Sequence, residues 1–113
     1  MKMEVTTNRY KHCNLISVKG RVDSNTAPDL GKAIAKSTDA GDFRLVIDLG
    51  GVDFLSSAGL RVLMLAQKTC KRYNRGEVKL AKVPPKIKSA LDLVGFTILF
   101  NFYDDPVSAV GSF

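Results

Sequence analysis

The chain has few cysteines and histidines, the residues that form disulfide bonds and most zinc sites. It contains two cysteines, Cys13 and Cys70, and one histidine, His12. The cysteines lie far apart and form no Cys-x-x-Cys pair, whereas zinc sites usually need three or four ligands. We therefore expect no metal site, and we expect reduced thiols in a cytoplasmic protein, with Cys70 in the core and His12 in a loop.

Long apolar runs are missing as well. No stretch approaches the roughly 18 apolar residues that a membrane-spanning helix needs, and residues 1–4 do not begin the apolar run of a signal peptide. The composition, 45% hydrophobic and 25% charged, is that of a soluble globular protein. A length of 113 residues fits one compact domain, so we expect a single domain over residues 1–113 with no membrane span.

Positive charge exceeds negative charge, with 17 lysines and arginines against 11 acidic residues and a net charge of +6. A nucleic-acid-binding domain is therefore one hypothesis. The positive residues are, however, scattered from Lys2 to Lys88, are not interleaved with aromatic residues and accompany no nucleic-acid-binding motif. We expect no specific nucleic-acid partner, and the salt dependence of binding would separate the two hypotheses.

Apolar patterning predicts an N-terminal hairpin and a central strand. Residues 3–7 and 15–19 indicate two strands around a turn at residues 8–14. The core positions of this hairpin are Val5, Ile16 and Val18. Residues 43–49 form the most apolar segment, and the missing alternation at its centre predicts burial on both faces and a central place in a sheet. A glycine pair then predicts a loop at residues 50–55.

Signals of a helix lie between the hairpin and the central strand. Thr26 is a candidate N-cap with Asp29 three residues later, and Pro28 lies in the first turn. Gly41 is expected to end this helix. The residues that share its apolar face are Leu30, Ala33 and Ile34.

The second half of the chain predicts alternating helices and strands. A helix begins at Ser56 or Ser57, runs to about Tyr73 and stops at residues 74–76. The later elements are a strand at residues 78–83, a helix from residues 84–85 to Gly95 with Ile87, Leu91 and Val94 on one face, a strand at residues 96–103 and a short helix at residues 106–109. This order predicts the α/β class, a mixed β-sheet covered by α-helices, because crossovers between parallel strands need a helix.

Two hydroxyl side chains, Ser56 and Ser57, stand at the start of the second helix. A serine N-cap adds about 1 kcal/mol to helix stability, so capping explains one of them. A phosphate on the other would meet unpaired N–H groups and the positive end of the helix dipole, and would leave the helix intact. Both capping alone and a phosphorylation switch remain open. Gly59 is expected to let the first turn pack closely against neighbouring backbone.

No catalytic set can be assembled around this helix start. Asp48 and Asp53 lie near it in sequence, but no histidine is close enough in sequence to complete an acid–base or nucleophilic group. We interpret both as turn or capping residues. The pair Gly50-Gly51 belongs to no phosphate-binding or dinucleotide-binding fingerprint. We expect no catalytic residues, no enzyme activity and no cofactor.

The second helix carries one further signal. At 100° intervals, the residues on its inner face are Val62, Leu63, Ala66 and Cys70, and those of a basic outer stripe are Arg61, Lys68 and Arg72. Met64 and Leu65 flank the basic stripe. They predict either a docking edge for a partner or burial under a neighbouring helix.

The sequence resembles the anti-sigma-factor antagonists, a family with the STAS fold. The stretches that carry the resemblance are the turn at residues 20–23 with Thr26-Ala27 after it, the strand at residues 45–49, the segment at residues 53–60 and the turn at residues 94–96. The resemblance implies a single STAS domain. In the family, the loop pattern is Asp-Ser-Ser/Thr-Gly-Leu, and the serine after the aspartate is phosphorylated by an anti-sigma factor that is itself a serine kinase.

The resemblance implies that Ser57 is the phosphorylated residue. Ser56 occupies the place of the aspartate, Ala58 that of the following hydroxyl residue, and Asp23 is expected to border the loop. The unphosphorylated chain would bind the kinase, phosphorylation would release it, and a serine phosphatase would act on the phosphorylated form. The expected partner-binding residues are Asp23, Ser56, Ser57, Ala58, Gly59, Arg61, Met64 and Leu65. The alternative is a STAS subunit that acts structurally in a lipid-transport or multiprotein signalling assembly, with Ser57 only as a cap.

Overall fold

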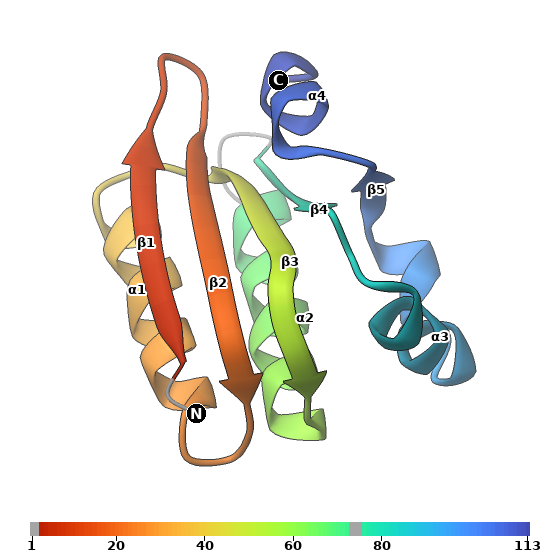
Figure 1. The fold of residues 1–113 in the computed structure, drawn as a ribbon. Helices are drawn as coiled ribbons and strands as arrows, with labels where there is room; N and C mark the ends of the chain where they lie inside the picture. Colours follow the sequence, from red (N-terminus) through yellow and green to blue (C-terminus); the bar gives the residue numbers. More distant parts are fainter. Residues whose placement is uncertain (1–2, 73–75) are drawn as a thin grey trace.

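The computed structural model describes residues 3–72 and 76–113 and contains a five-stranded sheet (Figure 1). The strands are β1 (Glu4–Arg9), β2 (Asn14–Val22), β3 (Arg44–Leu55), β4 (Glu77–Ala81) and β5 (Asn101–Tyr103), and they lie side by side in chain order. β1 is antiparallel to β2, and the other neighbouring strands are parallel. The predicted mixed sheet of the α/β class is confirmed.

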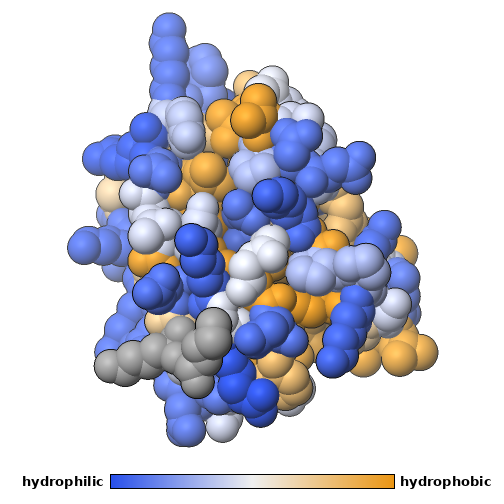
Figure 2. Space-filling view, viewed as in Figure 1, coloured by the Kyte–Doolittle hydropathy of each residue, from blue (hydrophilic) through white to orange (hydrophobic). Residues whose placement is uncertain are grey.

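Helices cover the two faces of the sheet unequally. They are α1 (Ala27–Asp39), α2 (Ser57–Arg72), α3 (Pro85–Leu93), the short 3₁₀ helix η1 (Phe96–Leu99) and α4 (Pro106–Gly111). The buried side chains of α1, α2 and α3 share one core with the sheet, whereas α4 packs on the opposite face. Figure 2 shows that the face opposite α1 and α2 is largely hydrophilic, with hydrophobic atoms gathered near α4 at the top and towards α3 and η1 at the lower right.

β3 is the central strand, as the apolar run predicted. Leu45 and Ile47 are fully buried in the core under α1, α2 and α3. Val46, between them, is fully buried against Ala109 of α4 on the opposite face. Because successive side chains of a strand point to opposite faces, burial of all these residues requires cover on both sides.

The predicted hairpin is confirmed, with a shorter turn. Its strands close at the pair Arg9 and Asn14, and a hydrogen bond of 2.8 Å from Tyr10 N–H to the Cys13 carbonyl spans the turn. Ile16 and Val18 are buried as expected, and Val5 is half-buried. The first helix also ends where predicted, since α1 stops before Gly41, whose φ is +89°.

The predicted loop at residues 50–55 is wrong, because β3 continues through the glycine pair to Leu55. β2 is longer than predicted as well and pairs with β3 as far as Val22, with register shifts after Ser17 and after Gly20. A Cβ on Gly51 would lie 2.6 Å from Cγ of Lys19. The glycines therefore allow β2 and β3 to approach closely where their parallel pairing is irregular. In the sequence alone, the same glycine pair indicates the end of a strand.

The predicted strand at residues 96–103 is also wrong over most of its length. Gly95, with a φ of +74°, turns the chain into η1, and β5 contains only Asn101–Tyr103. Of the predicted apolar face of α3, Ile87 and Leu91 are buried, but Val94 is 55% exposed. The predicted helix end near Tyr73 and the stop signal at residues 74 and 75 lie outside the described residues.

A buried glutamine, which no pattern in the sequence indicated, joins α2 to β4 and η1. Gln67 is 5% exposed and its Nε2 donates to the carbonyls of Val78, at 3.1 Å, and Leu99, at 2.7 Å. Its Oε1 accepts from Val78 N–H at 2.6 Å. β5 pairs with β4 only from Lys79 onward, so the glutamine completes the strand edge at Val78.

We predict that Gln67→Met lowers the free energy of unfolding by about 2 to 3 kcal/mol, because buried peptide groups lose their partners while the volume is kept. Denaturant unfolding followed by circular dichroism measures this change. The control is Lys68→Met at the exposed neighbouring position, which should change stability by less than about 0.5 kcal/mol. Equal stability of the two variants would contradict the bridging role.

Candidate functional site

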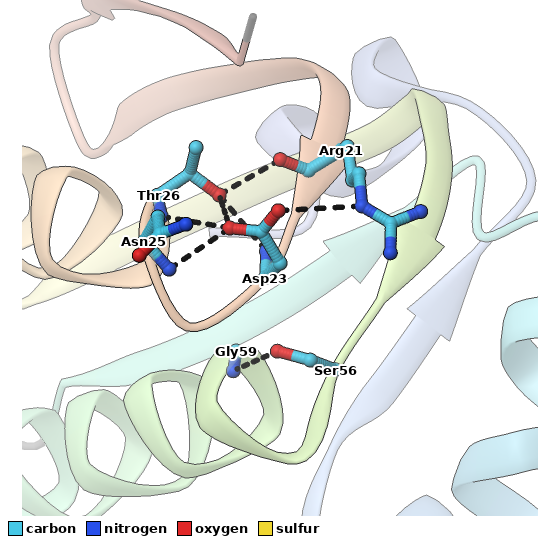
Figure 3. Close-up of polar contacts among 6 residues, drawn as sticks. All are labelled: Arg21, Asp23, Asn25, Thr26, Ser56 and Gly59. Atoms are coloured by element: carbon cyan, nitrogen blue, oxygen red, sulfur yellow. Dashed lines mark hydrogen bonds and ion pairs between the residues drawn. The ribbon is translucent and has the colours of Figure 1, made fainter. Parts of the chain in front are cut away.

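The candidate site lies where β2 and β3 end and α1 and α2 begin. The N–H of Ser56 donates to the carbonyl of Val22 at 2.8 Å, which fixes the start of α2 beside the end of β2. The turn between β2 and α1 lies above it (Figure 3). The β2–α1 turn and the start of α2 thereby place Asp23 and the serine pair at one end of the sheet.

Asp23 organises the β2–α1 turn. Its Oδ1 accepts from the N–H groups of Asn25, at 2.9 Å, and Thr26, at 3.0 Å. These backbone hydrogen bonds, with that of Thr26 the largest cause, lower the pKa of the Asp23 carboxyl. The carboxylate therefore stays charged at neutral pH as part of the turn (Figure 3).

Thr26 does not cap α1 in the way the sequence suggested. Its hydroxyl donates to the Arg21 carbonyl at 2.8 Å and accepts from Asp23 N–H at 2.9 Å, so it closes the turn (Figure 3). No side-chain hydrogen bond caps this helix, and the predicted capping box with Asp29 is not formed. The threonine hydroxyl has better partners before the helix than inside it.

Arg21 is held on the outer side of the same turn. Its Nε lies 3.3 Å from Oδ2 of Asp23, and its guanidinium carbon lies 4.0 Å from the centroid of the Phe54 ring. The ion pair and the cation–π contact together fix the direction of this side chain.

The two serines have different environments. Ser56 accepts a hydrogen bond of 3.3 Å from the N–H of Gly59 through its Oγ, which is N-capping of α2 (Figure 3). Ser57 is the first residue of α2 and is exposed. Among the residues that the structure describes, none forms a hydrogen bond with the Ser57 hydroxyl. One serine therefore caps the helix, and the hydroxyl of the other is available.

Gly59 lies against the sheet, as predicted, but its neighbours are side chains and not backbone. A Cβ at this position would be 2.6 Å from Cδ1 of Leu55 and 2.8 Å from Cγ1 of Val22. The glycine lets the first turn of α2 approach β2 and β3 closely, so it positions the serine pair without being exposed itself.

A groove runs between α1 and α2 from Ser57 towards Leu65. Its first part is a hollow of about 330 Å³ whose lining residues are Ser24, Ala27, Pro28, Ser57, Ala58, Arg61 and Val62. Its second part is a hollow of about 230 Å³ that Gly31, Val62 and Leu65 help to line. Val62 lines both parts, and we call them together the α1–α2 groove.

The outward residues of α2 follow the predicted arrangement. Leu63, Ala66 and Cys70 are buried, while Arg61, Lys68 and Arg72 are exposed. Val62 is only half-buried and lines the groove. Leu65 is 52% exposed and Met64 is half-buried, so no neighbouring helix covers Leu65.

No histidine, cysteine or carboxylate is among the described residues that line the hollow beside Ser57. Asp48 accepts from Gly50 N–H at 2.8 Å and Asp53 is exposed, but both residues lie within β3, so the turn or capping role predicted for them is wrong. Burial raises the pKa of the Cys70 thiol to about 11, so this sulfur is not a nucleophile. Over residues 3–72 and 76–113, no group of three metal-binding side chains is found, and no helix is long and apolar enough to cross a membrane.

Comparison with known proteins agrees with this fold. Residues 5–101 match the family described as "Mlab, STAS domain". Over 111 residues the chain is 31% identical to the putative anti-sigma factor antagonist BtrV of Bordetella bronchiseptica, an alignment that covers 98% of this chain and 95% of BtrV.

Solved structures give the same result. An anti-sigma factor antagonist from Mycobacterium paratuberculosis superposes with a TM-score of 0.88 at 26% identity, covering 98% of this chain and 93% of that one. The Bacillus cell fate determinant SpoIIAA in its phosphorylated form superposes with a TM-score of 0.76, covering 96% and 98%. The identity with SpoIIAA is 11%, so that likeness is one of fold.

We predict that Ser56→Ala lowers the free energy of unfolding by about 1 kcal/mol, because it removes the N-cap of α2. Ser57→Ala should change it by less than about 0.5 kcal/mol, because the hydroxyl is exposed and holds no cap. Urea unfolding of the two variants measures both values and uses each as the control for the other. A larger loss for Ser57→Ala would mean that Ser57 is the capping residue.

Proposed function

The chain belongs to the STAS domain family of anti-sigma factor antagonists, and from this premise we propose that it is a binding module controlled by phosphorylation of Ser57. In this proposal, the unmodified chain binds an anti-sigma factor that is a serine kinase. Phosphorylation of Ser57 releases the kinase, and a serine phosphatase restores the binding form. The chain itself carries out no catalysis.

The observation that carries the proposal is that one serine caps α2 and the other does not. Ser56 caps α2 through the bond from Gly59, which leaves the exposed Ser57 hydroxyl without a structural task. A phosphate at the first position of a helix is compatible with the helix dipole, so modification does not unfold α2. Ser57 can change its charge while the frame around it keeps its shape.

The kinase must supply the chemistry of the modification. It would transfer the γ-phosphoryl group of ATP to Ser57 Oγ, take up the hydroxyl proton and release ADP. Hydrolysis by the phosphatase would add water across the phosphate ester and return the serine and inorganic phosphate. Asp23 is engaged by the β2–α1 turn, and Ser56 offers no carboxylate.

The proposed partner surface follows one side of α2. Ser57, Arg61 and Leu65 stand at successive turns of the helix and all three are exposed. Leu65 offers an apolar contact beside the groove, Arg61 a positive charge, and Ser57 the point of control. Met64 contributes a half-buried edge, whereas Gly59 and Asp23 hold the frame. The complementary surface would combine an apolar side chain with a carboxylate.

The alternative is a structural subunit of a larger assembly, and one observation favours it. Leu93 is 87% exposed and Ile98 is 88% exposed, at the end of α3 and in η1. Neighbouring exposed aliphatic side chains are often covered in a complex. If that surface were the only one used, changes at Ser57 would leave assembly unaffected.

We predict that Ser57→Ala abolishes phosphorylation and keeps partner binding, whereas Ser57→Asp weakens binding at least about tenfold, or 1.4 kcal/mol. Alanine removes only a hydroxyl, but aspartate places a negative charge at the partner surface. Mass spectrometry after treatment with the serine kinases of the same genome maps the phosphate, and calorimetric titration measures binding.

Ser56→Ala is the matched control, since it should leave the phosphorylation site available. A phosphate on Ser56, or wild-type affinity of Ser57→Asp, would overturn the proposed switch and favour the structural subunit.

A further prediction concerns Leu65. Leu65→Asp should weaken kinase binding by more than about 2 kcal/mol, because a charge replaces the apolar contact beside the groove. Its thermal melting should remain close to that of the wild type, since the side chain is 52% exposed. Leu93→Asp is the matched control, an exposed leucine outside α2 that should leave kinase affinity unchanged. Equal loss of affinity in both variants would refute the docking edge on α2.

A further inference from the structure

Two arginines, Arg21 and Arg61, belong to the elements that meet at the candidate site around Ser57. Arg21 reaches the site from the end of β2, and Arg61 comes from α2 itself. Arginine is the side chain that pairs most effectively with phosphate, through parallel N–H···O bonds. The existing contacts of each arginine decide which of them is able to respond to the modification.

Arg21 is already engaged. It forms the 3.3 Å ion pair with Asp23 and the 4.0 Å cation–π contact with Phe54. Movement towards a phosphate would break both contacts and would remove the positive neighbour of the Asp23 carboxylate. Arg21 therefore stays with the β2–α1 turn.

Arg61 is available. It follows Ser57 by one helical turn, so the two side chains lie on the same side of α2. Both line the hollow of about 330 Å³, and the other residues that line it carry no charge. Within the described part of the chain, Arg61 forms no ion pair or hydrogen bond. A phosphate beside it would meet a guanidinium with all its donors unused.

The charge of Asp23 favours the same choice. Its pKa is lowered chiefly by the backbone hydrogen bond from Thr26, so it is a carboxylate at neutral pH. Repulsion between this carboxylate and a phosphate dianion disfavours the side of Ser57 towards the β2–α1 turn. The phosphate is therefore expected on the side of α2 that carries Arg61.

We propose that Arg61 binds the phosphate of phosphorylated Ser57 within the same chain, a regulatory contact that rests on the phosphorylation proposed above. Phosphorylation then changes the partner surface in two ways. It adds negative charge at Ser57, and it withdraws the Arg61 guanidinium from the partner's carboxylate. The two changes act together to release the partner.

The test is a pH titration of the full chain with phosphoserine incorporated at position 57 during translation, followed by ³¹P NMR. A neighbouring guanidinium stabilises the dianion, so the second pKa of the phosphate should be lower in the wild type than in Arg61→Gln, by about half a pH unit. The matched control is Lys68→Gln, which loses the same charge from the same side of α2 three turns away and should titrate like the wild type. Circular dichroism confirms that both variants are folded.

The outcomes separate this inference from the proposed function. An equal titration midpoint in the wild type and Arg61→Gln, or an equal shift in Arg61→Gln and Lys68→Gln, would overturn the contact with Arg61. Because the phosphoserine is installed without a kinase, the titration does not depend on the identity of the kinase. The proposed function fails in a different measurement, if the phosphorylated and unmodified chains bind the partner kinase equally well.

Discussion

The extended pairing of β2 with β3 determines the geometry of the whole site. The two strands run side by side past the glycine pair and end at the pair Val22 and Leu55, where Ser56 N–H bonds to the Val22 carbonyl. This last bond fixes where α2 begins, and the β2–α1 turn fixes where α1 begins. Had the chain left the sheet at Gly50, as the sequence suggested, a loop at residues 50–55 would have separated the serine pair from the sheet. Instead it lies at the end of a paired strand, and sites on rigid elements hold their geometry more closely than sites on loops.

The absence of the family's aspartate at position 56 changes the electrostatics of the site more than its geometry. Serine and aspartate are both good N-cap residues, so Ser56 keeps the capping bond to Gly59 N–H. What is lost is a negative charge next to Ser57. Asp23 is still a carboxylate at this end of the sheet, and it accepts hydrogen bonds from Asn25 and Thr26 within the β2–α1 turn. The electrostatic potential at Ser57 is therefore less negative than it would be in a chain with an aspartate at position 56 as well as Asp23.

Sequence patterns predicted the parts of this fold that depend on burial and missed those that depend on pairing partners. The apolar run at Leu45 to Ile47 was enough to identify the central strand, since only a strand covered on both faces lacks alternation. The continuation of β3 depends on the opposing strand, because Gly51 is needed only where Lys19 comes close. Gln67 looks like a surface residue until the unpaired edge of β4 is known. At the site, the resemblance identified the serine pair, but only the bond to Gly59 N–H showed which serine is the cap.

The hollow beside Ser57 is lined by no histidine, cysteine or carboxylate among the described residues, and this bears on how long a phosphate on Ser57 would last. Phosphate esters of serine hydrolyse extremely slowly in water unless a catalyst assists them. Under the proposed function, a phosphorylated copy would keep its state until a phosphatase meets it. The chain would then act as a record of past kinase activity, with a lifetime set by the abundance of another protein.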